Sequence, residues 1–336
     1  MFYGEEKVEI IHTPVLLQEC LFWLTPEGEP YEKKAFMIDS TLGEGGHSFA
    51  FLSEFPGLSI LGVDADASIQ ARARERLAAF GPRMQFFNGW FNDFYAAYPS
   101  GIPKPQIILF DLGISSYHYI RSGKGFSFLN DEPLDMRLDS GTGKSAADIV
   151  NMMTEKELAD ILYLYSEEKF SHRIAKAIVA ARNVCTIASS KALADIIYEA
   201  VPPQYRYGKI HPATRTFQAL RIAVNSELQR LPAALFAAFN ILECGGKMGV
   251  ITFHSLEDRI VKNCFRNLGK QCVCPPEVPV CMCGGKPCAE LLTRKPVVPT
   301  ETEVKRNPPS RSAKLRVVKK LRNTTEYHIF GFSGGK

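Results

Sequence analysis

The sequence lacks any long hydrophobic run, and this absence excludes a large class of proteins. None of its apolar stretches reaches the roughly 18 residues of a membrane-spanning helix. The amino-terminal residues, MFYGEEKVEI, also lack the basic segment followed by an apolar one that marks a secretory signal peptide. We therefore expect a cytoplasmic protein without membrane partners.

A disulfide framework is excluded as well, although the chain has nine cysteines. The odd count and the missing export signal both argue against paired cysteines. Five of the nine lie between Cys272 and Cys288, in the stretch CVCPPEVPVCMCGGKPC. Its cysteines form C-x-C pairs, whereas structural zinc sites are usually built from C-x2-C knuckles. We interpret the stretch as an insertion loop with reduced thiols and predict no metal site, with zinc as the alternative.

Charge is nearly balanced over the whole chain but not along it. The 336 residues carry a net charge of +4, and 46% of them are hydrophobic, which is typical of a globular protein. Lys169 to Arg230 contains ten basic residues against three acidic ones, and Leu291 to Arg322 contains ten against two. Two basic regions on a nearly neutral chain indicate a polyanionic partner, with a solvated surface as the alternative.

Short apolar runs early in the chain predict the strands of a parallel sheet. Each is followed by helical or loop material, as expected for a sheet with helices on both faces. The runs are AFMID (35–39), LSILGVD (58–64), MQFFN (84–88) and QIILFD (106–111). The stretch ASIQARARERLAAF (67–80) predicts a helix that crosses between strands. The expected fold class is therefore α/β, with a doubly wound sheet.

This pattern stops after residue 111 and resumes near the carboxyl terminus. Residues 121 to 225 show helical periodicity and no convincing strand, whereas KMGVITFHS (247–255) and KLRVVKKL (314–321) predict further strands. We expect a discontinuous sheet domain that carries a helical insertion. Its predicted parts are residues 1–120 and 226–322 for the sheet domain, 121–225 for the insertion, 269–309 for an extended Cys- and Pro-rich loop, and 323–336 for a tail.

The glycine-rich stretch IDSTLGEGGHS, residues 38 to 48, follows the first predicted strand and is the candidate cofactor loop. It departs from the dinucleotide fingerprint G-x-G-x-x-G, because Ser48 replaces the last glycine. Asp39 would repel a pyrophosphate but attract the ammonium group of S-adenosylmethionine, by about 4 kcal/mol at 4 Å and an effective dielectric of 20. Asp64, at the end of the second strand, is placed to bind ribose hydroxyls. Together these features favour a methyltransferase.

Two motifs of other enzyme classes are absent. GTGKS (141–145) resembles the end of a phosphate-binding P-loop, but the full motif requires glycine where Leu138 stands. A Ser-His-Asp hydrolase is a poor alternative, because the chain has no G-x-S-x-G elbow.

The fourth predicted strand ends in DLGISS, residues 111 to 116. Ligands of open α/β sheets bind beyond the carboxyl ends of the strands, so Asp111 should lie near the cofactor. A carboxylate there can accept a hydrogen bond from the amine of a nucleobase and assist the loss of its proton. Asp111 is therefore the predicted catalytic residue, with a contact to ribose or water as the alternative.

Eight longer stretches carry a resemblance to one family. The chain resembles the ribosomal small-subunit RNA cytosine-N4 methyltransferases, RsmH (formerly MraW). The matching stretches are HTPVLLQE (12–19), DSTLGEGGHS (39–48), DLGISS (111–116), GKGFSF (123–128), PLDMRLD (133–139), HPATRTFQALRIAVNSEL (211–228), GVITFHSLEDRIVK (249–262) and NPPSRSAKLRV (307–317).

The resemblance implies a class I, Rossmann-like methyltransferase fold and S-adenosylmethionine as methyl donor. The implied acceptor is the N4 amine of a cytosine in the decoding region of 16S rRNA, in the small ribosomal subunit. The resemblance carries over the cofactor contacts Gly45, Gly46, His47, Asp64, Phe91 and Asp111. His118 stands where the family commonly has glutamine; both side chains form hydrogen bonds, but only histidine becomes charged near neutral pH.

Six residues are candidates for contacts with the RNA substrate. They lie in three of the family stretches, four of them within the predicted insertion and two after it, and are Arg137, His211, Arg215, Asn225, His254 and Ser255. For His254 and Ser255, a contact with the methionine end of the cofactor is the alternative. Arg137 either meets a phosphate or pairs with neighbouring acids, and Phe126 or Phe128 is placed to stack on a splayed base. A core helix with basic residues at its rim is the alternative for residues 211–228.

Two other functions remain as alternatives. An NAD(P)-dependent oxidoreductase is opposed by Asp39 and Ser48. A non-catalytic RNA-binding protein needs the basic regions but neither the glycine loop nor the acids at the strand ends. The sequence leaves the oligomeric state open, with a homodimer as one alternative.

Overall fold

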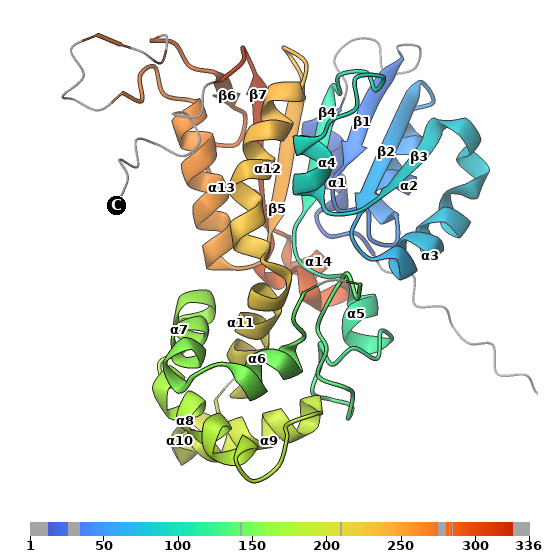
Figure 1. Ribbon diagram of the computed structural model, residues 1–336. Coiled ribbons are helices and arrows are strands. Elements are labelled where there is room, and N and C mark those ends of the chain that lie inside the picture. Colours follow the sequence, from blue (N-terminus) through green and yellow to red (C-terminus); the bar gives the residue numbers. More distant parts are fainter. Residues whose placement is uncertain are drawn as a thin grey trace, which may run out of the picture.

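A seven-stranded sheet forms the upper layer of the molecule in Figure 1, and a group of helices forms the lower layer. The computed structural model describes residues 13–25, 34–141, 143–208, 210–274, 280–281, 283 and 285–324. The strands are β1 (Ala35–Asp39), β2 (Leu58–Asp64), β3 (Met84–Asn88), β4 (Ile107–Asp111), β5 (Lys247–Thr252), β6 (Ala289–Leu291) and β7 (Lys314–Lys320). Their order across the sheet is β3-β2-β1-β4-β5-β7-β6.

The predicted strands are confirmed. β1, β2 and β3 begin and end at the predicted residues, and β4, β5 and β7 lie within the predicted runs. Neighbours from β3 to β5 pair in parallel, whereas β7 runs antiparallel to β5 and β6. The strand order reverses between β1 and β4, which is where open α/β sheets bind ligands. This is the expected Rossmann-like fold of class I methyltransferases.

Helices cover both faces of the sheet. One face carries α4 (Phe91–Ala96), α12 (Glu227–Ile241) and α13 (Ser255–Leu268), and the other carries α1 (Leu17–Leu24), α2 (Gly46–Glu54) and α3 (Ala67–Leu77). Ile38 and Phe110 are buried with the first group, and Met37 and Leu109 with the second, because successive residues of a strand point to opposite faces. No helix in the described ranges is both long and apolar enough to cross a membrane.

The chain between β4 and α12 forms the lower layer, which has its own hydrophobic core. Its helices are α5 (Ser116–Ile120), α6 (Ala146–Met152), α7 (Glu155–Ser166), α8 (Ser171–Arg182), α9 (Ser190–Ala200), α10 (Pro203–Arg206) and α11 (Ala213–Asn225). Ile174 and Ile178 of α8 are buried in this core, whereas Arg173 and Lys176 are exposed. α8 therefore turns an apolar stripe inward and a basic one to solvent.

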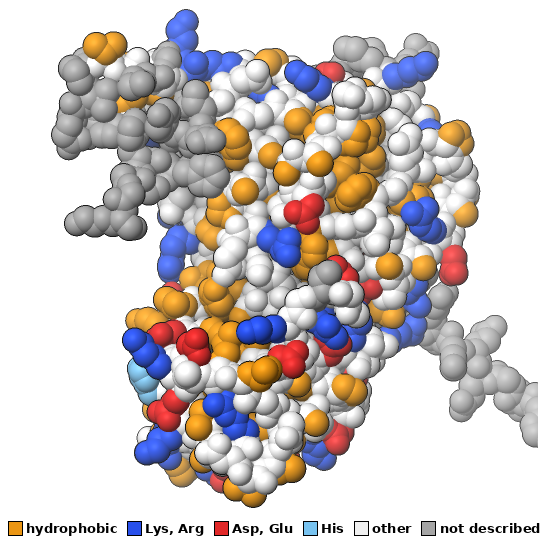
Figure 2. Space-filling model, viewed as in Figure 1, with side chains coloured by type: hydrophobic (Ala, Val, Ile, Leu, Met, Phe, Trp, Pro, Cys, Tyr) orange, Lys and Arg blue, Asp and Glu red, His pale blue; other side chains and the backbone are white. Residues whose placement is uncertain are grey.

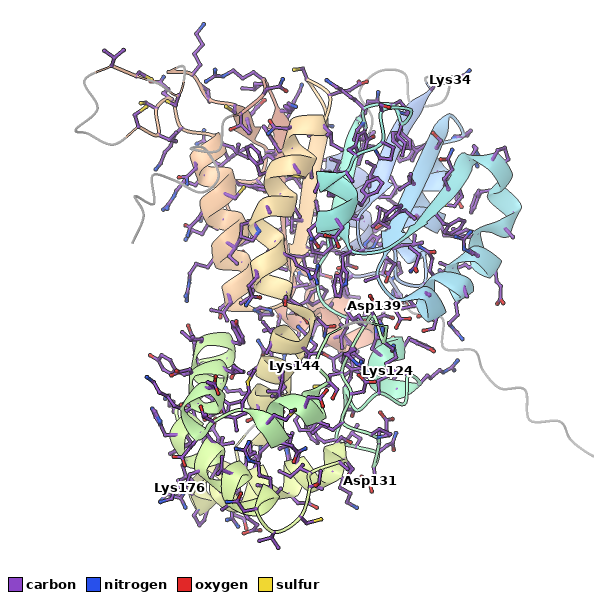
Figure 3. The ribbon with its side chains drawn as sticks, in the orientation of Figure 1. Lys34, Lys124, Asp131, Asp139, Lys144 and Lys176 are labelled. Carbon is purple, nitrogen blue, oxygen red and sulfur yellow. The ribbon has the colours of Figure 1, made fainter. Side chains whose placement is uncertain are left out.

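Two connections join the layers. α11 of the lower layer meets α12 of the upper layer at Ser226, where a φ of 51° bends the chain. Asp66, which caps α3, lies 3.2 Å from both His118 Nε2 and Lys124 Nζ of the segment that leads into the lower layer. Figure 3 shows Lys124 and Asp139 where the layers meet. The insertion is thus attached to the sheet by a helix junction and by charge pairing.

The sequence predicted one extended loop over residues 269–309, and this prediction is wrong. They contain β6, which pairs with β7, and α14 (Glu301–Arg306), and a 3-10 helix (Pro308–Ser312) follows. The prediction missed β6 because this strand has three residues and is fixed by pairing with a strand distant in sequence. Glu303 of α14 accepts a hydrogen bond from the Leu16 N–H at 2.8 Å, so this segment also packs against the amino-terminal part.

Asn225, at the end of α11, offers a test of how the lower layer is held. It is buried; its Oδ1 accepts a hydrogen bond from the Leu138 N–H at 2.9 Å, and its Nδ2 donates to the Met136 carbonyl at 2.8 Å. Asn225→Ala removes both bonds from a buried place. We expect the free energy of unfolding, measured by urea denaturation, to fall by about 2–4 kcal/mol.

Lys176→Ala is the matched control, because Lys176 is an exposed helix residue of the same layer. Its free energy of unfolding should change by less than about 0.5 kcal/mol. Equal losses of unfolding free energy in the two variants would show that the hydrogen bonds of Asn225 do not stabilise the lower layer.

Candidate active site

A cavity of about 690 Å³ opens at the carboxyl ends of the parallel strands, between the two layers. Cofactor pockets usually measure about 300–1,000 Å³. The walls come from the β1–α2 loop, the end of β2, the β4–α5 loop, α11 and the start of α13. The cavity therefore occupies the place where a doubly wound sheet binds its ligand.

The glycine-rich loop is shaped by close packing as well as by the cavity. Gly43 lines the cavity and has a φ of +53°, a conformation that favours glycine. A Cβ at Gly45 would lie 2.7 Å from Leu77, and a Cβ at Gly46 would lie 2.5 Å from Pro14. The loop thus passes tightly between α3 and the amino-terminal segment. It leads into the start of α2, which no side chain caps.

Asp39 is buried beneath this loop and is not part of the cavity wall, whereas the next residue, Ser40, is. Its Oδ2 accepts a hydrogen bond from the Ser48 hydroxyl at 2.7 Å, and its Oδ1 has no partner among the described residues. Burial raises the pKa of Asp39 to about 6, although the Ser48 bond lowers it. Asp39 therefore supports the loop from behind, and a direct contact with the cofactor's ammonium group stays a prediction.

Asp111 and His47 lie side by side in the cavity wall. His47 Nδ1 is 3.5 Å from Asp111 Oδ2, and His47 Nε2 is 3.0 Å from the Val15 carbonyl oxygen. Burial raises the pKa of Asp111 well above its usual range, and the charges of Asp39 and Glu257 raise it further. Asp111 Oδ1 is buried without a hydrogen-bond partner in the described part of the chain. Such an acceptor marks a place for a donor from a ligand.

Asp64 and Phe91 line the cavity beyond β2 and at the start of α4. The Asp64 carboxylate accepts hydrogen bonds from the Gly43 N–H at 2.8 Å and the Asp66 N–H at 2.9 Å. A carboxylate has further acceptor sites, so these bonds fix Asp64 without saturating it. Phe91 packs edge-on against Phe110, with 5.6 Å between ring centroids. A carboxylate beside an aromatic ring suits the ribose and adenine of an adenosine cofactor.

His118, the residue that departs from the family pattern, is buried in the wall and already engaged. Its Nε2 shares Asp66 Oδ2 with Lys124. Burial acts to raise the pKa of Asp66, but the bonds from His118 and Ser68 and the charge of Lys124 lower it overall. The contact between Asp66 and His118 Nε2 fixes the position of the imidazole. Its buried Nδ1 has no hydrogen-bond partner among the described residues. His118 therefore has an unused ring nitrogen where a cofactor contact is predicted.

One face of α11 lines the cavity, and the sequence did not predict which. Phe217, Gln218 and Arg221 lie three, four and seven residues after Thr214, so these four residues share one side of the helix. Arg215 lies about 100° further round and is not part of the wall. The helical spacing was visible in the sequence, but nothing there showed which side of α11 meets the cavity.

Two further predicted substrate residues make structural contacts outside the wall. His211 accepts a hydrogen bond from the first N–H of α11 at 3.2 Å and lies against the Phe128 ring, with 4.6 Å between centroids. The Arg137 guanidinium bonds the Asp135 carboxylate at 2.6 and 3.1 Å. Asn225 also lies outside the wall, whereas Phe128 lines it. RNA contacts of these residues remain predictions.

The end of β5 adds a charged network to the wall. His254 Nε2 lies 3.0 Å from Glu257 Oε1, and the Arg221 guanidinium contacts both Glu227 oxygens at 2.9 and 3.0 Å. Burial acts to raise the pKa of Glu257, but His254 and Arg221 lower it overall. Glu227, His254 and Glu257 lie close enough together for a metal ion, yet Arg221 already supplies the opposite charge. Ser255 is exposed and lies outside the wall.

The wall fits S-adenosylmethionine. The uncapped start of α2 favours a carboxylate, and the unpaired oxygen of Asp111 favours an ammonium or amine group. Asp64 and Phe91 suit the adenosine. Of the predicted cofactor contacts, the wall contains Gly46, His47, Asp64, Phe91, Asp111 and His118, while Asp39 and Gly45 lie behind it.

Comparison with known proteins supports the resemblance read from the motifs. The sequence model of the MraW methylase family matches residues 9–321. Ribosomal RNA small subunit methyltransferase H of Treponema denticola is 56% identical over 311 residues, which cover 93% of this chain and 98% of that protein. The proteins of the same name from Treponema pallidum and Borreliella afzelii are 44% and 45% identical, again over 93% of this chain, and 93% and 99% of theirs.

Solved structures are similar at a lower level. An rRNA methylase from Streptococcus thermophilus has a TM-score of 0.37 at 10% identity, covering 86% of this chain and 88% of that one. A Streptococcus mutans protein in complex with SAH has a TM-score of 0.39 at 12% identity, covering 93% of this chain and 100% of that one. The family match and the identities of 44% and 56% to relatives over 93% of the sequence decide the assignment: the chain belongs to the MraW methylase family.

Proposed function

We propose that this protein transfers a methyl group from S-adenosylmethionine to the N4 amine of a cytosine in the decoding region (P site) of 16S rRNA. Methylase activity and the methyl donor follow from family membership, which also removes the oxidoreductase and the non-catalytic RNA-binding protein as alternatives. The observation that supports the acceptor is the buried, unpaired Oδ1 of Asp111 in the cavity wall. The small ribosomal subunit is the proposed partner.

Asp111 has the position and the chemistry to assist an amine nucleophile. Bound S-adenosylmethionine supplies a methyl group activated by a sulfonium. The exocyclic amine of cytosine is conjugated with its ring and is a poor nucleophile. Asp111 accepts a hydrogen bond from this amine, orients it, and takes its proton at a carboxylate oxygen as the N–C bond forms. The raised pKa of Asp111 makes the carboxylate a stronger base for this proton.

The lower layer offers an aromatic surface for a base that has left its stack. Phe128 and Phe217 both line the cavity and pack edge-on, with 5.0 Å between centroids. Leu129, next to them in the wall, is 86% exposed. Unstacking a base costs a few kcal/mol, least in single-stranded RNA. Aromatic faces partly replace the lost stacking.

Basic side chains outside the cavity supply affinity for the RNA backbone. On the face shown in Figure 2, Lys and Arg side chains are spread over both layers, among Asp and Glu side chains on the lower one. Such contacts are independent of sequence and weaken with salt. We therefore assign base selection to the cavity and much of the affinity to these distributed cations.

Asp111→Asn tests the proposed role in catalysis. The amide keeps the size of the side chain but is a poor proton acceptor, so the rate of methyl transfer to small subunits should fall about 10²-fold or more. Tritium transfer from labelled S-adenosylmethionine measures the rate, and isothermal titration measures cofactor affinity. Glu75→Gln, which removes an exposed carboxylate of α3, is the control and should leave both unchanged.

Other outcomes of these measurements would change the role of Asp111 or the identity of the acceptor. Wild-type turnover in Asp111→Asn removes the residue from the chemistry, and loss of cofactor binding reassigns it to the cofactor. Nucleoside analysis of the product identifies the acceptor atom. Label found elsewhere than on N4 of cytosine shows that the proposed acceptor is wrong.

The pH dependence of the reaction tests the coupling between Asp111 and Asp39. A proton acceptor must be ionised, so kcat/KM should fall as the pH drops through the raised pKa of Asp111, above the ordinary value of about 3.9. Asp39→Asn removes one of the charges that raise this pKa. The acidic limb of the profile should therefore move to lower pH in the variant. If the acidic limb of the profile does not move, either Asp111 does not set the pH dependence of kcat/KM or the charge of Asp39 does not affect the pKa of Asp111.

A further inference from the structure

Four cysteines of the segment between α13 and β6 meet at one point. They come from two C-x-C pairs and are Cys272, Cys274, Cys281 and Cys283. All four sulfur atoms lie within 4.8 Å of one another. The sulfur of Cys272 is 3.6 Å from that of Cys281 and 3.5 Å from that of Cys283, and Cys281 and Cys283 are 3.4 Å apart. All nine cysteines of the chain are described, and none forms a disulfide.

These separations match a tetrahedral metal site. Zinc binds cysteine sulfur at about 2.3 Å, which places the four sulfurs of a regular tetrahedron about 3.8 Å apart. The observed distances are within a few tenths of an ångström of that value and far from the length of about 2.05 Å of a disulfide bond. The C-x-C spacing, which in the sequence argued against zinc, therefore does not prevent four sulfurs from converging.

The surroundings support bound thiolates. The Val273 N–H donates a hydrogen bond to the Cys283 sulfur at 3.4 Å, the kind of outer contact that orients metal ligands. Four thiolates and one Zn²⁺ carry a net charge of −2. The Arg322 guanidinium, which donates to the carbonyls of Cys283 and Lys286, brings positive charge beside them. Cys288 is buried separately and contacts the Asn323 carbonyl, so it is not a fifth ligand.

The position of the cluster indicates a structural role. α13 starts in the cavity wall, and its 14 residues span about 21 Å before the cysteine segment begins. In Figure 1 the described part of this segment lies beyond the ends of α13 and β6, away from the lower layer. Lys270, Gln271, Val280 and Lys286 are exposed, so the described part of the segment buries little apolar surface of its own. A metal cross-link replaces a hydrophobic core in segments of this kind.

We propose that Cys272, Cys274, Cys281 and Cys283 bind one zinc ion as a closed structural site that ties the end of α13 to β6. All four ligand positions are filled by protein, so the site has no open position for catalysis. Binding converts thiols to thiolates and releases their protons to the solvent, without oxidation or reduction. The inference is independent of the methyl acceptor, since it concerns the far end of the sheet layer.

Metal analysis of the full-length protein, produced with zinc and purified under reducing conditions, is the first test. We expect about one mole of zinc per mole of protein. Replacement by Co²⁺ should give the visible absorption of a tetrahedral cobalt–thiolate centre. Cys272→Ser combined with Cys283→Ser should abolish both signals. Cys185→Ser and Cys244→Ser are matched controls, because these cysteines are exposed and outside the cluster, and both variants should retain the metal.

The wild-type cobalt spectrum keeps the proposal testable even if the double variant does not fold. Protein that contains essentially no zinc and gives no thiolate–cobalt absorption would overturn the proposal. So would an intact mass that shows disulfides within the cluster under the same reducing conditions. Removing the metal with a chelator should lower the unfolding temperature of wild type and leave that of the double variant unchanged; equal shifts would contradict a structural site at these cysteines.

Discussion

The burial of several carboxylates at one edge of the sheet is the constraint on which the active site depends. Asp39, Asp64 and Asp111 end three adjacent parallel strands, and burial raises the pKa of each. Like charges a few ångströms apart repel by several kcal/mol at an effective dielectric of about 20, so each needs donors. The Ser48 hydroxyl donates a hydrogen bond to Asp39, and the N–H groups of Gly43 and Asp66 donate to Asp64. Asp111 keeps an unpaired oxygen in the cavity wall, which makes it available to a ligand.

The lower layer supplies positive charge from Lys124 and Arg221, and a hydrogen-bonding contact from His118, to other acids near the cavity. His118 and Lys124 pair with Asp66, and Arg221 pairs with Glu227 near the buried Glu257. These contacts neutralise acids of the sheet layer and at the same time fix the position of the helices over the cavity. The insertion therefore contributes part of the wall of the candidate active site. The predicted cofactor residues of the sheet layer and the aromatic residues Phe128 and Phe217 of the lower layer line one cavity. This arrangement suits a reaction between a cofactor and a base bound side by side.

Local patterns predicted the fold well because its central strands are short apolar runs. β1, β2 and β3 begin and end at the predicted residues, and six of the predicted cofactor contacts line the cavity. Prediction failed where the outcome depends on contacts distant in sequence. β6 is set by its pairing with β7, and the lining side of α11 is set by how the lower layer docks on the sheet. For the same reason the sequence did not show that Arg215 lies outside the cavity wall, and its contact with RNA stays a prediction.

The sequence by itself determined the α/β class, the order of the strands along the chain and the family, because apolar periodicity and long motifs are local properties. Only the tertiary structure decided which side chains meet. It placed Asp39 behind the loop, left Asp111 with an unpaired oxygen, and turned Gln218 and Arg221 toward the cavity. It also brought two C-x-C pairs to one point, although the spacing within each pair argued against a metal. Distances between side chains depend on packing across the whole chain, and no local pattern contains them.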